Sequence, residues 1–396
     1  MEKLICPGPL RGTVSVPPSK SELHRALICA ALCEGETAVV CRSPADDVAA
    51  TARCLRALGA GAVYRDGKYY VNKIAPRGAA EADCGESGST LRFLLPLAAA
   101  LGTETEFLCR GRLAERPMEP LLNVLNANGC TAFRRGECYL LRGRLLPGCY
   151  GLDASVSSQF LSGLLLALPL LPGSGIKLSG PVASKDYVNF SSEVMQQFGV
   201  ETRCSDGTYA AAGAYHSPGT YVPEGDWSAA AYWLTANALG SEVMPDGLNP
   251  QSTQGDRAVT GLLAEIRRGG AVIDAGNVPD LVPPLAVLAA VTPGETRFVN
   301  AARLRQKESD RLAAATAMLN ALGGECTETA DGLSVRGVSS LRGGTVDSFG
   351  DHRIAMAAAV AATVCRETVT LRGAECVSKS YPAFWSDFTK LGGKAK

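Results

Sequence analysis

The sequence predicts an α/β protein built from six copies of one small unit, three in each half of the chain. The first observation is a recurring corner in which an amphipathic helix ends at a glycine and a short strand follows, as in LRALGAGAV and MLNALGGECT. The second is the spacing of these corners, roughly 70 residues with one shorter interval. The third is a length of 396 residues, which exceeds one ordinary core and favours two domains. The corner glycines are Gly59, Gly129, Gly199, Gly269, Gly323 and Gly392.

The composition is that of a soluble globular protein. Apolar residues make up 46% of the chain and charged residues 20%, which argues against a disordered chain. The formal net charge is zero, so bulk charge supports neither a nucleic-acid surface nor an anchor to an anionic membrane. We expect no secretory leader, because the first residues contain no apolar core followed by a small-residue cleavage site. We also expect no transmembrane helix, because the longest apolar run is short and is interrupted by Pro169 and Pro172.

The cysteines and histidines do not form a metal-binding pattern. The fourteen cysteines are scattered without a CxxC pair, and there are only three histidines. We therefore expect reduced thiols, most of them small core residues, in a cytoplasmic protein.

Four helix starts carry basic residues where the positive end of the helix dipole disfavours them. In PPSKSELHRAL, Lys20 and Arg25 begin a helix, and Ser19 with Glu22 forms a capping-box pattern. Bound anions or local ion pairs would balance such charges. No GxxxxGK[ST] or GxGxxG motif accompanies them, so nucleotide sites of those two kinds are not predicted. In SFGDHRIAM, Asp351 is expected to be the N-cap of a helix that has Arg353 just inside it. The stretches CGESGSTLRF, QKESDRLAAA and SFGDHRIAM repeat the arrangement with Arg92, Lys307, Arg311 and Arg353.

Other polar clusters are weaker signals on their own. SVSSQF gathers hydroxyl and amide groups before an apolar helix, and SKDY and NVPDLV are similar. Asp280 precedes an apolar helix and is either a simple helix cap or, beside several cations, an ionised base. Lys379 lies in a predicted loop before Pro382, where a lone lysine usually faces solvent.

Together these stretches resemble the 5-enolpyruvylshikimate-3-phosphate synthase family of enolpyruvyl transferases, also called 3-phosphoshikimate 1-carboxyvinyltransferases. The resemblance implies a two-domain inside-out α/β barrel, with three βαβαββ-type repeats in each domain and the active site in the interdomain cleft. It also implies a discontinuous domain of residues 1–19 and 225–396 and a second domain of residues 20–224. It covers essentially the whole chain and is carried, in the family's order, by SKSELHRAL, GESGSTLRF, ERPMEPLL, SVSSQFL, SKDY, PEGDWSAAAYWL, NVPD, RQKESDRL, GDHRIAM and SKSYPAF.

The reaction implied by the resemblance explains these residue types. The family transfers the enolpyruvyl group of phosphoenolpyruvate to the 5-hydroxyl of shikimate 3-phosphate, releasing phosphate, in the chorismate route to aromatic amino acids. Addition and then elimination through a tetrahedral intermediate require a base, an acid and fixed positive charge. No metal ion or organic cofactor is implied. The expected partners are the two small-molecule substrates, without nucleic acid or membrane, and the expected form is a monomer.

The resemblance assigns roles residue by residue. Asp280 is expected to be the base for the 5-hydroxyl, Glu308 and Lys379 the proton-transfer pair at the methylene carbon, and Lys20 a further catalytic residue. Residues expected to hold phosphoenolpyruvate are Lys20, Gly88, Arg116, Arg311, Arg353 and Lys379. Residues expected to hold or adjoin shikimate 3-phosphate are Ser21, Arg25, Ser157, Ser158, Gln159, Ser184, Tyr187, Asp280 and Lys307.

The chain also departs from the family's pattern. Arg303 stands where some members have an asparagine that touches the shikimate moiety, which puts that contact in doubt. Ser89 and Phe93 replace a threonine and a proline at the border of the pocket that the herbicide glyphosate shares with phosphoenolpyruvate. Because Gly88 is kept, glyphosate is expected to compete with phosphoenolpyruvate. Arg92 is expected to be a structural anchor behind the site.

Two alternative functions remain open at this point. The sibling transferase that acts on UDP-N-acetylglucosamine shares fold and chemistry but uses a Lys-Asn pair near its start and a loop cysteine. This chain has Lys20 and Ser21 instead, and no cysteine in the segment around Arg116. An inactive repeat scaffold would keep the glycine corners but would have no reason to keep the cations and carboxylates together.

Overall fold

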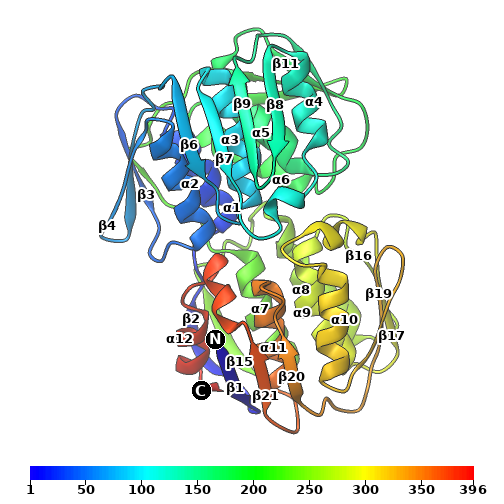
Figure 1. Cartoon of the computed structure of the whole chain (residues 1–396). Helices are drawn as coiled ribbons and strands as arrows, with labels where there is room; N and C mark the ends of the chain where they lie inside the picture. The colour runs from blue at the N-terminus through cyan, green and yellow to red at the C-terminus, as the bar shows by residue number, and fades with distance from the viewer. The chain divides into compact units, whose positions relative to one another are not determined.

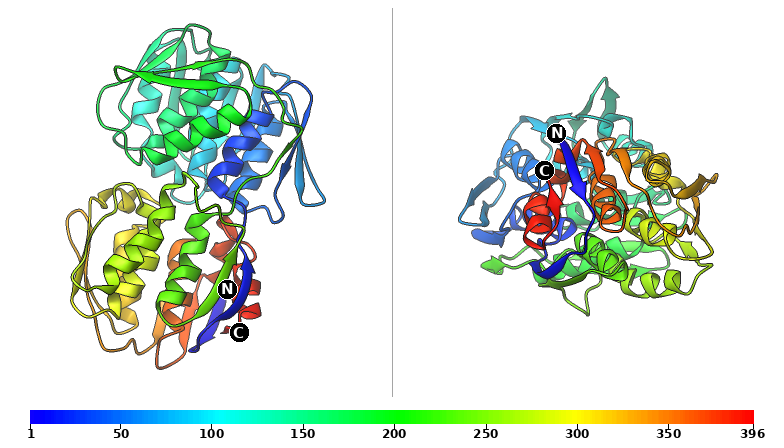
Figure 2. Two further views of the ribbon diagram at one scale, coloured as in Figure 1. Left: turned by 180° about the vertical axis from the view of Figure 1, so that it is seen from behind. Right: turned by 90° about the horizontal axis from the view of Figure 1, so that it is seen from below.

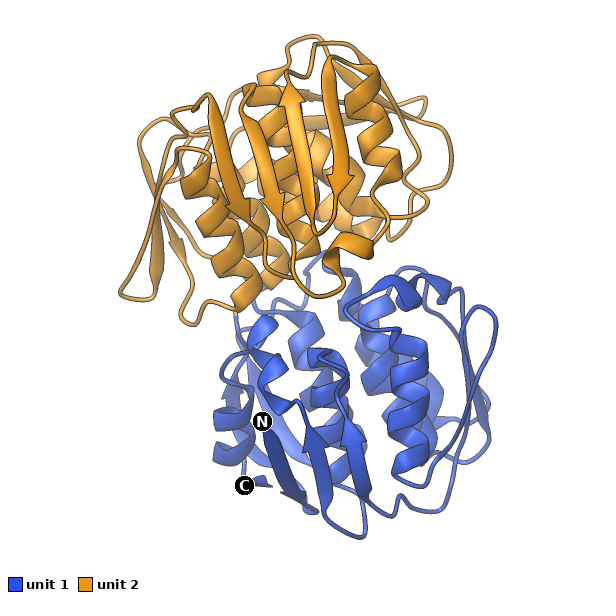
Figure 3. Ribbon diagram, viewed as in Figure 1, with its two compact units in different colours: residues 1–17, 225–396 blue, residues 18–224 orange.

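The computed structural model describes residues 1–396, which fall into two compact units. Unit 1 comprises Met1–Pro17 and Gly225–Lys396, and unit 2 comprises Pro18–Glu224 (Figure 3). The chain therefore passes from one unit to the other twice. No helix is both long and apolar enough to span a lipid bilayer.

Unit 2 contains three four-stranded sheets that share one topology. In each sheet the first two strands are parallel, and a hairpin then adds two antiparallel strands beside the second one. In order of hydrogen bonding, the sheets are β14 (Thr220–Tyr221), β3 (Glu36–Val40), β5 (Lys68–Asn72), β4 (Gly61–Arg65); β6 (Ala79–Asp83), β7 (Glu104–Leu108), β9 (Cys138–Gly143), β8 (Cys130–Arg135); and β10 (Cys149–Leu152), β11 (Gly175–Leu178), β13 (Thr208–Ala212), β12 (Glu201–Ser205).

One helix joins the two parallel strands of each repeat and a second helix leads into the hairpin. The helices α1, α2, α3, α5 and α6 pack on one another, and the sheet β6–β7–β9–β8 lies outside α3 and α5 (Figure 1). Nine of the ten residues of α5 are buried, which explains why its sequence is apolar all round. The helices of unit 2 are α1 (Lys20–Ala30), α2 (Asp46–Ala57), α3 (Gly88–Leu101), α4 (Glu119–Ala127), α5 (Ser158–Ala167) and α6 (Asp186–Gln197), with short 3₁₀ helices η1 (Leu113–Glu115) and η2 (Leu168–Leu170).

Unit 1 repeats the same plan with two changes. Its sheets are β20 (Gly344–Asp347), β21 (Val369–Arg372), β1 (Glu2–Cys6), β22 (Lys394–Ala395); β16 (Val272–Asp274), β17 (Glu295–Val299), β19 (Leu333–Arg336), β18 (Glu325–Glu328); and the pair β2 (Arg11–Ser15), β15 (Glu242–Asp246). Its helices are α7 (Trp227–Ala238), α8 (Val259–Arg267), α9 (Val282–Ala290), α10 (Arg311–Ala321), α11 (His352–Ala362) and α12 (Phe384–Lys390), with η3 (Gly255–Ala258), η4 (Pro279–Leu281), η5 (Ala302–Gln306) and η6 (Ala374–Lys379).

The first change closes one repeat with the two ends of the chain. β1 at the N-terminus pairs antiparallel with both β21 and the C-terminal strand β22, so the two termini take the place of a hairpin (Figure 2). The second change is a missing hairpin, since β2 and β15 form a sheet of only two parallel strands. After α8 the chain turns at Gly269 directly into β16, the first strand of the next sheet.

The missing hairpin explains the one short interval in the sequence repeat. The Gly269–Gly323 interval is 54 residues, whereas the Gly59–Gly129 interval is 70, and the difference is the length of a short hairpin. All six corner glycines have positive φ, between 80° and 106°, as predicted for left-handed helix ends.

Both crossings between the units fall between a strand and the helix that follows it in the repeat. The chain leaves unit 1 after β2 and starts α1, and it leaves unit 2 after β14 and starts α7. In consequence β14 and α1 belong to one repeat although they are nearly two hundred residues apart in sequence, and β2 and α7 are separated in the same way.

Replacing Gly59 by alanine is expected to destabilise unit 2 by about 3 kcal/mol. A Cβ at Gly59 would lie 2.1 Å from the carbonyl oxygen of Ala75, and the residue has φ +106°. Gly240 is a matched control, because its φ is +102° and a Cβ there meets nothing within 4 Å, so Gly240→Ala is expected to cost only about 1 kcal/mol. Urea unfolding measures both. Equal losses would contradict the steric explanation.

Candidate active site

The predicted site residues share one kind of position in both units. Each lies in, or within the first turns after, a corner that leads from one of the two parallel strands of a repeat into the next helix. Examples are Gly88 at the first position of α3, after β6, Arg116 between β7 and α4, and Lys379 between β21 and α12. Because these strands and helices repeat, each unit gathers such corners from three successive repeats.

In unit 2, the N-terminal ends of α1, α2 and α3 are connected by polar contacts. The Nζ of Lys20 donates to the Asp47 carboxylate at 2.7 Å, and both side chains are largely buried. The hydroxyl of Thr90 contacts the backbone carbonyl of Asp47 at 3.4 Å and the Oγ of Ser87 at 2.7 Å. Of the two sources of negative charge left open for Lys20, the structure shows the local ion pair, with Asp47.

Arg25 is buried and connects α1 to α6. Its guanidinium donates to the Oγ of Ser191 at 2.7 Å and to the backbone carbonyls of Ser21 at 2.7 Å and Tyr187 at 3.0 Å. Its plane also lies over the ring of Phe93, 4.9 Å from the centroid. Burial lowers the pKa of Arg25 to about 10, so it remains a cation at neutral pH.

Gly88 and the guanidinium group of Arg116 are in close approach. A Cβ on Gly88 would lie 2.8 Å from a guanidinium nitrogen of Arg116. Next to it, the side-chain amide of Gln159 donates to Ser89 at 2.8 Å and accepts from Arg92 at 2.8 Å. Arg92 also donates to the backbone carbonyl of Pro117 at 2.9 Å, and its role as a structural anchor stays a prediction.

The remaining predicted residues of unit 2 lie at the starts of α5 and α6. Ser157 is the N-cap of α5 and accepts from the N–H of Gln159 at 3.3 Å, and Ser158 is buried beside it. Ser184 is buried with φ +49°, and its carbonyl accepts from the N–H of Tyr187 at 3.1 Å.

Unit 1 holds a compact cluster of cations and carboxylates centred on Asp280. One oxygen of Asp280 accepts from Arg311 at 2.8 Å, and the other accepts from Arg353 at 2.8 Å. The Nζ of Lys307 lies 3.9 Å from the first of these oxygens. Asp280 lies within η4 and caps no helix, so the reading of Asp280 as a simple helix cap is wrong.

Arg311 is the most heavily paired residue of this cluster. It is 1% exposed and donates to both oxygens of Asp351, at 2.9 and 3.2 Å, and to Glu308 at 2.6 Å. Asp351 is fully buried, caps α11 as predicted by accepting from the N–H of Arg353, and also accepts from Ser309. The arginine thus neutralises carboxylates from three different corners.

Electrostatics keep the Asp280 carboxylate ionised. Burial alone would raise the pKa of Asp280, but the charges of Arg353, Lys307 and Arg311 outweigh burial and hold that pKa well below the usual range. An ionised carboxylate next to two guanidinium groups can accept a proton from a hydroxyl group that binds beside it.

Lys379 and Arg303 border the same corners. The Nζ of Lys379 donates to the carbonyl of Gly350 at 2.8 Å, immediately before Asp351. Lys379 ends η6, so the prediction of a plain loop is wrong. Arg303 donates to the carbonyl of Gly276 at 2.6 Å, and burial lowers its pKa.

Sequence reasoning missed three carboxylates in these clusters. Asp47, the partner of Lys20, looked like an ordinary acid at a helix start, and Asp351 was predicted only as a cap. Asp256 is fully buried and accepts from Ser228, and one of its oxygens has no partner. Burial and the charge of Asp280 raise the pKa of Asp256 to about 7. The only signal in the sequence for these three carboxylates is that each stands at or just before the start of a helix.

The capping-box prediction at the start of α1 is half correct. Ser19 accepts from the N–H of Glu22 at 3.4 Å, as the pattern requires. The Glu22 carboxylate does not return to Ser19, whose N–H instead donates to the carbonyl of Glu224 at 2.8 Å. The Glu22 carboxylate instead accepts hydrogen bonds from the Tyr221 hydroxyl and from the backbone N–H of Glu224.

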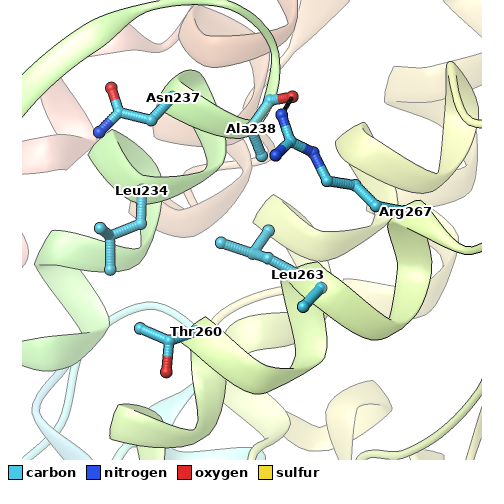
Figure 4. Close-up of a pocket in the computed structure, with 7 residues that line it drawn as sticks. Leu234, Asn237, Ala238, Thr260, Leu263 and Arg267 are labelled. Atoms are coloured by element: carbon cyan, nitrogen blue, oxygen red, sulfur yellow. Dashed lines mark hydrogen bonds between the residues drawn. The ribbon is translucent and has the colours of Figure 1, made fainter.

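A shallow pocket of about 420 Å³ between α7 and α8 is separate from these clusters (Figure 4). It is mostly apolar, and Arg267 crosses one end, donating to the carbonyl of Ala238 at 2.6 Å. No predicted site residue lines it. The lining residues are Leu234, Asn237, Ala238, Thr260, Leu263, Ala264 and Arg267.

Replacing Arg311 by methionine is expected to lower the free energy of unfolding by about 4 kcal/mol, because buried carboxylates lose their counter-ion. The control is Arg305→Met. Arg305 also makes ion pairs, with Asp310 at 3.0 Å and Glu328 at 2.6 Å, but it is one-third exposed. Its loss should cost less than about 1 kcal/mol. Urea unfolding of the two variants compares them directly. Similar losses would contradict the structural importance assigned to Arg311.

Comparisons with known proteins agree with one another. A sequence model of the family EPSP synthase (3-phosphoshikimate 1-carboxyvinyltransferase) matches residues 5–388. The 3-phosphoshikimate 1-carboxyvinyltransferase of Clostridium kluyveri is 40% identical over 98% of this chain and 97% of its own length. That of Clostridium acetobutylicum is also 40% identical, over 97% of this chain and 96% of its own length.

Solved structures match the fold over the full length. The EPSP synthase from Acinetobacter baumannii superimposes with a TM-score of 0.78 and 24% identity, over 100% of this chain and 99% of that one. The enolpyruvyl transferase NikO from Streptomyces tendae gives a TM-score of 0.77 at 19% identity, over 100% of this chain and 98% of that one. The predicted α/β fold class with six repeats is confirmed.

Proposed function

The chain belongs to the EPSP synthase family, and we propose that the residues at its strand-to-helix corners carry that family's reaction here. Its activity is the transfer of the enolpyruvyl group from phosphoenolpyruvate to shikimate 3-phosphate, in aromatic amino acid biosynthesis. The proposal concerns which side chains bind each substrate and which move protons.

The clusters of both units act on the same pair of substrates. Both substrates carry phosphate and carboxylate groups, which buried arginines and lysines recognise through charge-assisted hydrogen bonds. Phosphoenolpyruvate contacts Lys20, Gly88, Arg116, Arg311, Arg353 and Lys379. Shikimate 3-phosphate contacts or adjoins Ser21, Arg25, Ser157, Ser158, Gln159, Ser184, Tyr187, Asp280 and Lys307.

Proton transfer falls to three residues of unit 1. Asp280 accepts the proton of the 5-hydroxyl group of shikimate 3-phosphate while the oxygen of that hydroxyl group bonds to C2 of phosphoenolpyruvate. Lys379 and Glu308 deliver a proton to the methylene carbon, which becomes a methyl group. The same pair then takes a proton back from that methyl group as phosphate leaves the tetrahedral intermediate, which completes the enolpyruvyl product. The cations around the departing phosphate stabilise its charge.

The observation that carries this assignment is the contact of Arg311 and Arg353 with opposite oxygens of one ionised carboxylate, Asp280. The same two guanidinium groups that keep Asp280 ionised can bind a phosphate or carboxylate of the substrates. The carboxylate proposed to accept the proton is thus unprotonated before the addition step, next to cations suited to the anionic groups of the substrates.

A reciprocal pair of substitutions tests the division of substrates. Arg25→Lys should raise KM for shikimate 3-phosphate about 30-fold and leave KM for phosphoenolpyruvate within threefold, because lysine keeps the charge but loses the planar set of donors. Arg116→Lys should show the opposite selectivity. Steady-state kinetics with each substrate varied in turn measures both values. Equal effects of each variant on both substrates would contradict the division.

We also propose a cytoplasmic location and a monomeric form for this enzyme. All fourteen cysteines are free thiols, which suits work in a reducing cytoplasm. One chain supplies every proposed substrate contact, so a second chain is not needed to complete the site, and we propose that the working form is a monomer. Sedimentation under assay conditions should give the mass of a single chain, and a dimer would contradict this.

A further inference from the structure

A buried glutamate connects helix α1 to a strand of its own repeat that is distant in sequence. Glu22 lies in the first turn of α1 and is 4% exposed. One carboxylate oxygen accepts from the Tyr221 hydroxyl at 2.6 Å, and the other accepts from the N–H of Glu224 at 3.0 Å. The carbonyl of Glu224 accepts from the N–H of Ser19 at 2.8 Å. Glu22 therefore holds both ends of the segment 221–224, and Ser19 holds it at Glu224.

Tyr221 offers Glu22 a fixed partner. It belongs to β14, where it pairs with Val39 of β3, and it is 2% exposed. Its ring stacks on Phe198 with the centroids 5.1 Å apart. The hydroxyl that Glu22 contacts therefore has a defined position relative to the sheet.

Most of the other repeats need no such connection, because the chain itself joins their first strand to their first helix. In four of them the chain runs directly from the first strand to the first helix: β6 to α3, β10 to α5, β16 to η4 and α9, and β20 to α11. β14 and α1 have no such link, because the chain enters unit 2 at Pro18, just before α1, and leaves it at Glu224, just after β14. The other interrupted repeat, β2 and α7, has Ala229 at the position of Glu22 and is joined by a bond from the N–H of Asp226 to the carbonyl of Pro17 at 2.9 Å.

We propose that Glu22 is a positioning residue for the transferase reaction: its carboxyl group replaces the missing covalent connection and so fixes Lys20 and Ser21 at the start of α1. The inference rests on the substrate contacts proposed for Lys20 and Ser21. Small displacements of substrate-positioning groups cost rate and affinity, so a defined first turn of α1 matters for both substrates.

The connecting carboxyl group also titrates in the neutral range. Burial raises the pKa of Glu22 to about 7, and the charge of Glu224 adds to this. The hydrogen bonds from Tyr221 and the N–H of Glu224 and the charge of Arg25 oppose it. The unfolded chain loses this proton near pH 4.5, the ordinary pKa of a glutamate. Between pH 4.5 and about pH 7, Glu22 therefore keeps its proton only in the folded protein. The stability that protonated Glu22 contributes is therefore present at low pH and lost as the pH rises to about 7.

Kinetics of three variants test the positioning role. Glu22→Ala removes both contacts and should raise KM for both substrates about tenfold. Glu22→Gln should remain within threefold of wild type, because its amide oxygen can accept from Glu224 and its amide nitrogen can donate to Tyr221. Tyr221→Phe removes one hydroxyl and keeps the ring stacking, so it tests the connection if Glu22→Ala fails to fold, and it should raise both KM values about threefold. Glu81→Ala, at an exposed glutamate of unit 2, is the control.

A pH series provides the second readout. The melting temperature of Glu22→Gln minus that of wild type should rise by about 5 °C between pH 5 and pH 7.5 and stay constant above. The proposal is overturned if Glu22→Ala and Tyr221→Phe keep wild-type KM values, if Glu22→Gln is as damaging as Glu22→Ala, or if the temperature difference is independent of pH. Lys20→Ala in the same assay separates the two proposals. If Lys20→Ala keeps both wild-type KM values, the substrate contacts of Lys20 are wrong instead.

Discussion

Lys379→Ala is expected to lower kcat about a thousandfold, because the methylene carbon of phosphoenolpyruvate loses the proton donor proposed for it. Lys379 ends η6, next to the buried ion cluster, and its Nζ contacts the carbonyl of Gly350. Shikimate 3-phosphate should still bind with a Kd within threefold of wild type, since Lys379 is assigned to the other substrate. Phosphate release gives kcat, and calorimetric titration with shikimate 3-phosphate gives the Kd.

Lys390→Ala is the matched control for Lys379→Ala. Lys390 is a mostly exposed lysine of the following helix that pairs with Asp387 at 3.3 Å, so its loss should leave kcat unchanged. Normal turnover by Lys379→Ala would refute its role as the acid. Loss of shikimate 3-phosphate binding as well would mean that Lys379 organises the site rather than donating a proton.

Asp280→Asn is expected to lower kcat by a similar factor, about a thousandfold, because asparagine cannot accept the proton of the 5-hydroxyl. The pKa of Asp280 is held well below the usual range by Arg353, Lys307 and Arg311 against the effect of burial. The Asp280 carboxylate therefore stays ionised on acidification, and any loss of wild-type rate between pH 7 and pH 5 is expected to arise from another group. The pH dependence of kcat for wild type and variant measures this.

Asp256→Asn controls for the effect of removing a buried carboxyl group from the same region. Burial and the charge of Asp280 raise the pKa of Asp256 to about 7, so at pH 6 asparagine resembles the protonated side chain already present. Asp256→Asn should keep kcat within threefold at that pH. If Asp280→Asn were as active as Asp256→Asn at pH 6, the assignment of Asp280 as the base would be wrong.

The repeat could be predicted because its signal is local. Each corner needs a residue that tolerates positive φ, and all six predicted glycines have it, from Gly59 to Gly392. The missing hairpin after Gly269 left a trace only as a shorter interval. The pairing of β1 with β21 and β22 left none, because contacts between the two ends of the chain depend on how whole repeats pack.

The site was predictable where the sequence places the wrong charge at a helix start. Lys20, Arg311 and Arg353 were found in that way, and the resemblance to a family added their roles. Their counter-ions Asp47 and Asp351 were not identified, because an acid at a helix start is what any helix favours. Which corner supplies the acid depends on which repeats are neighbours, and no local pattern encodes that.

Phosphate release from phosphoenolpyruvate, with each of two acceptors in turn, tests the assigned reaction most directly. The account predicts release with shikimate 3-phosphate and none with UDP-N-acetylglucosamine, and loss of the first activity in Lys20→Ala of unit 2 and in Asp280→Asn of unit 1. Release only with UDP-N-acetylglucosamine, or with neither acceptor, would contradict it.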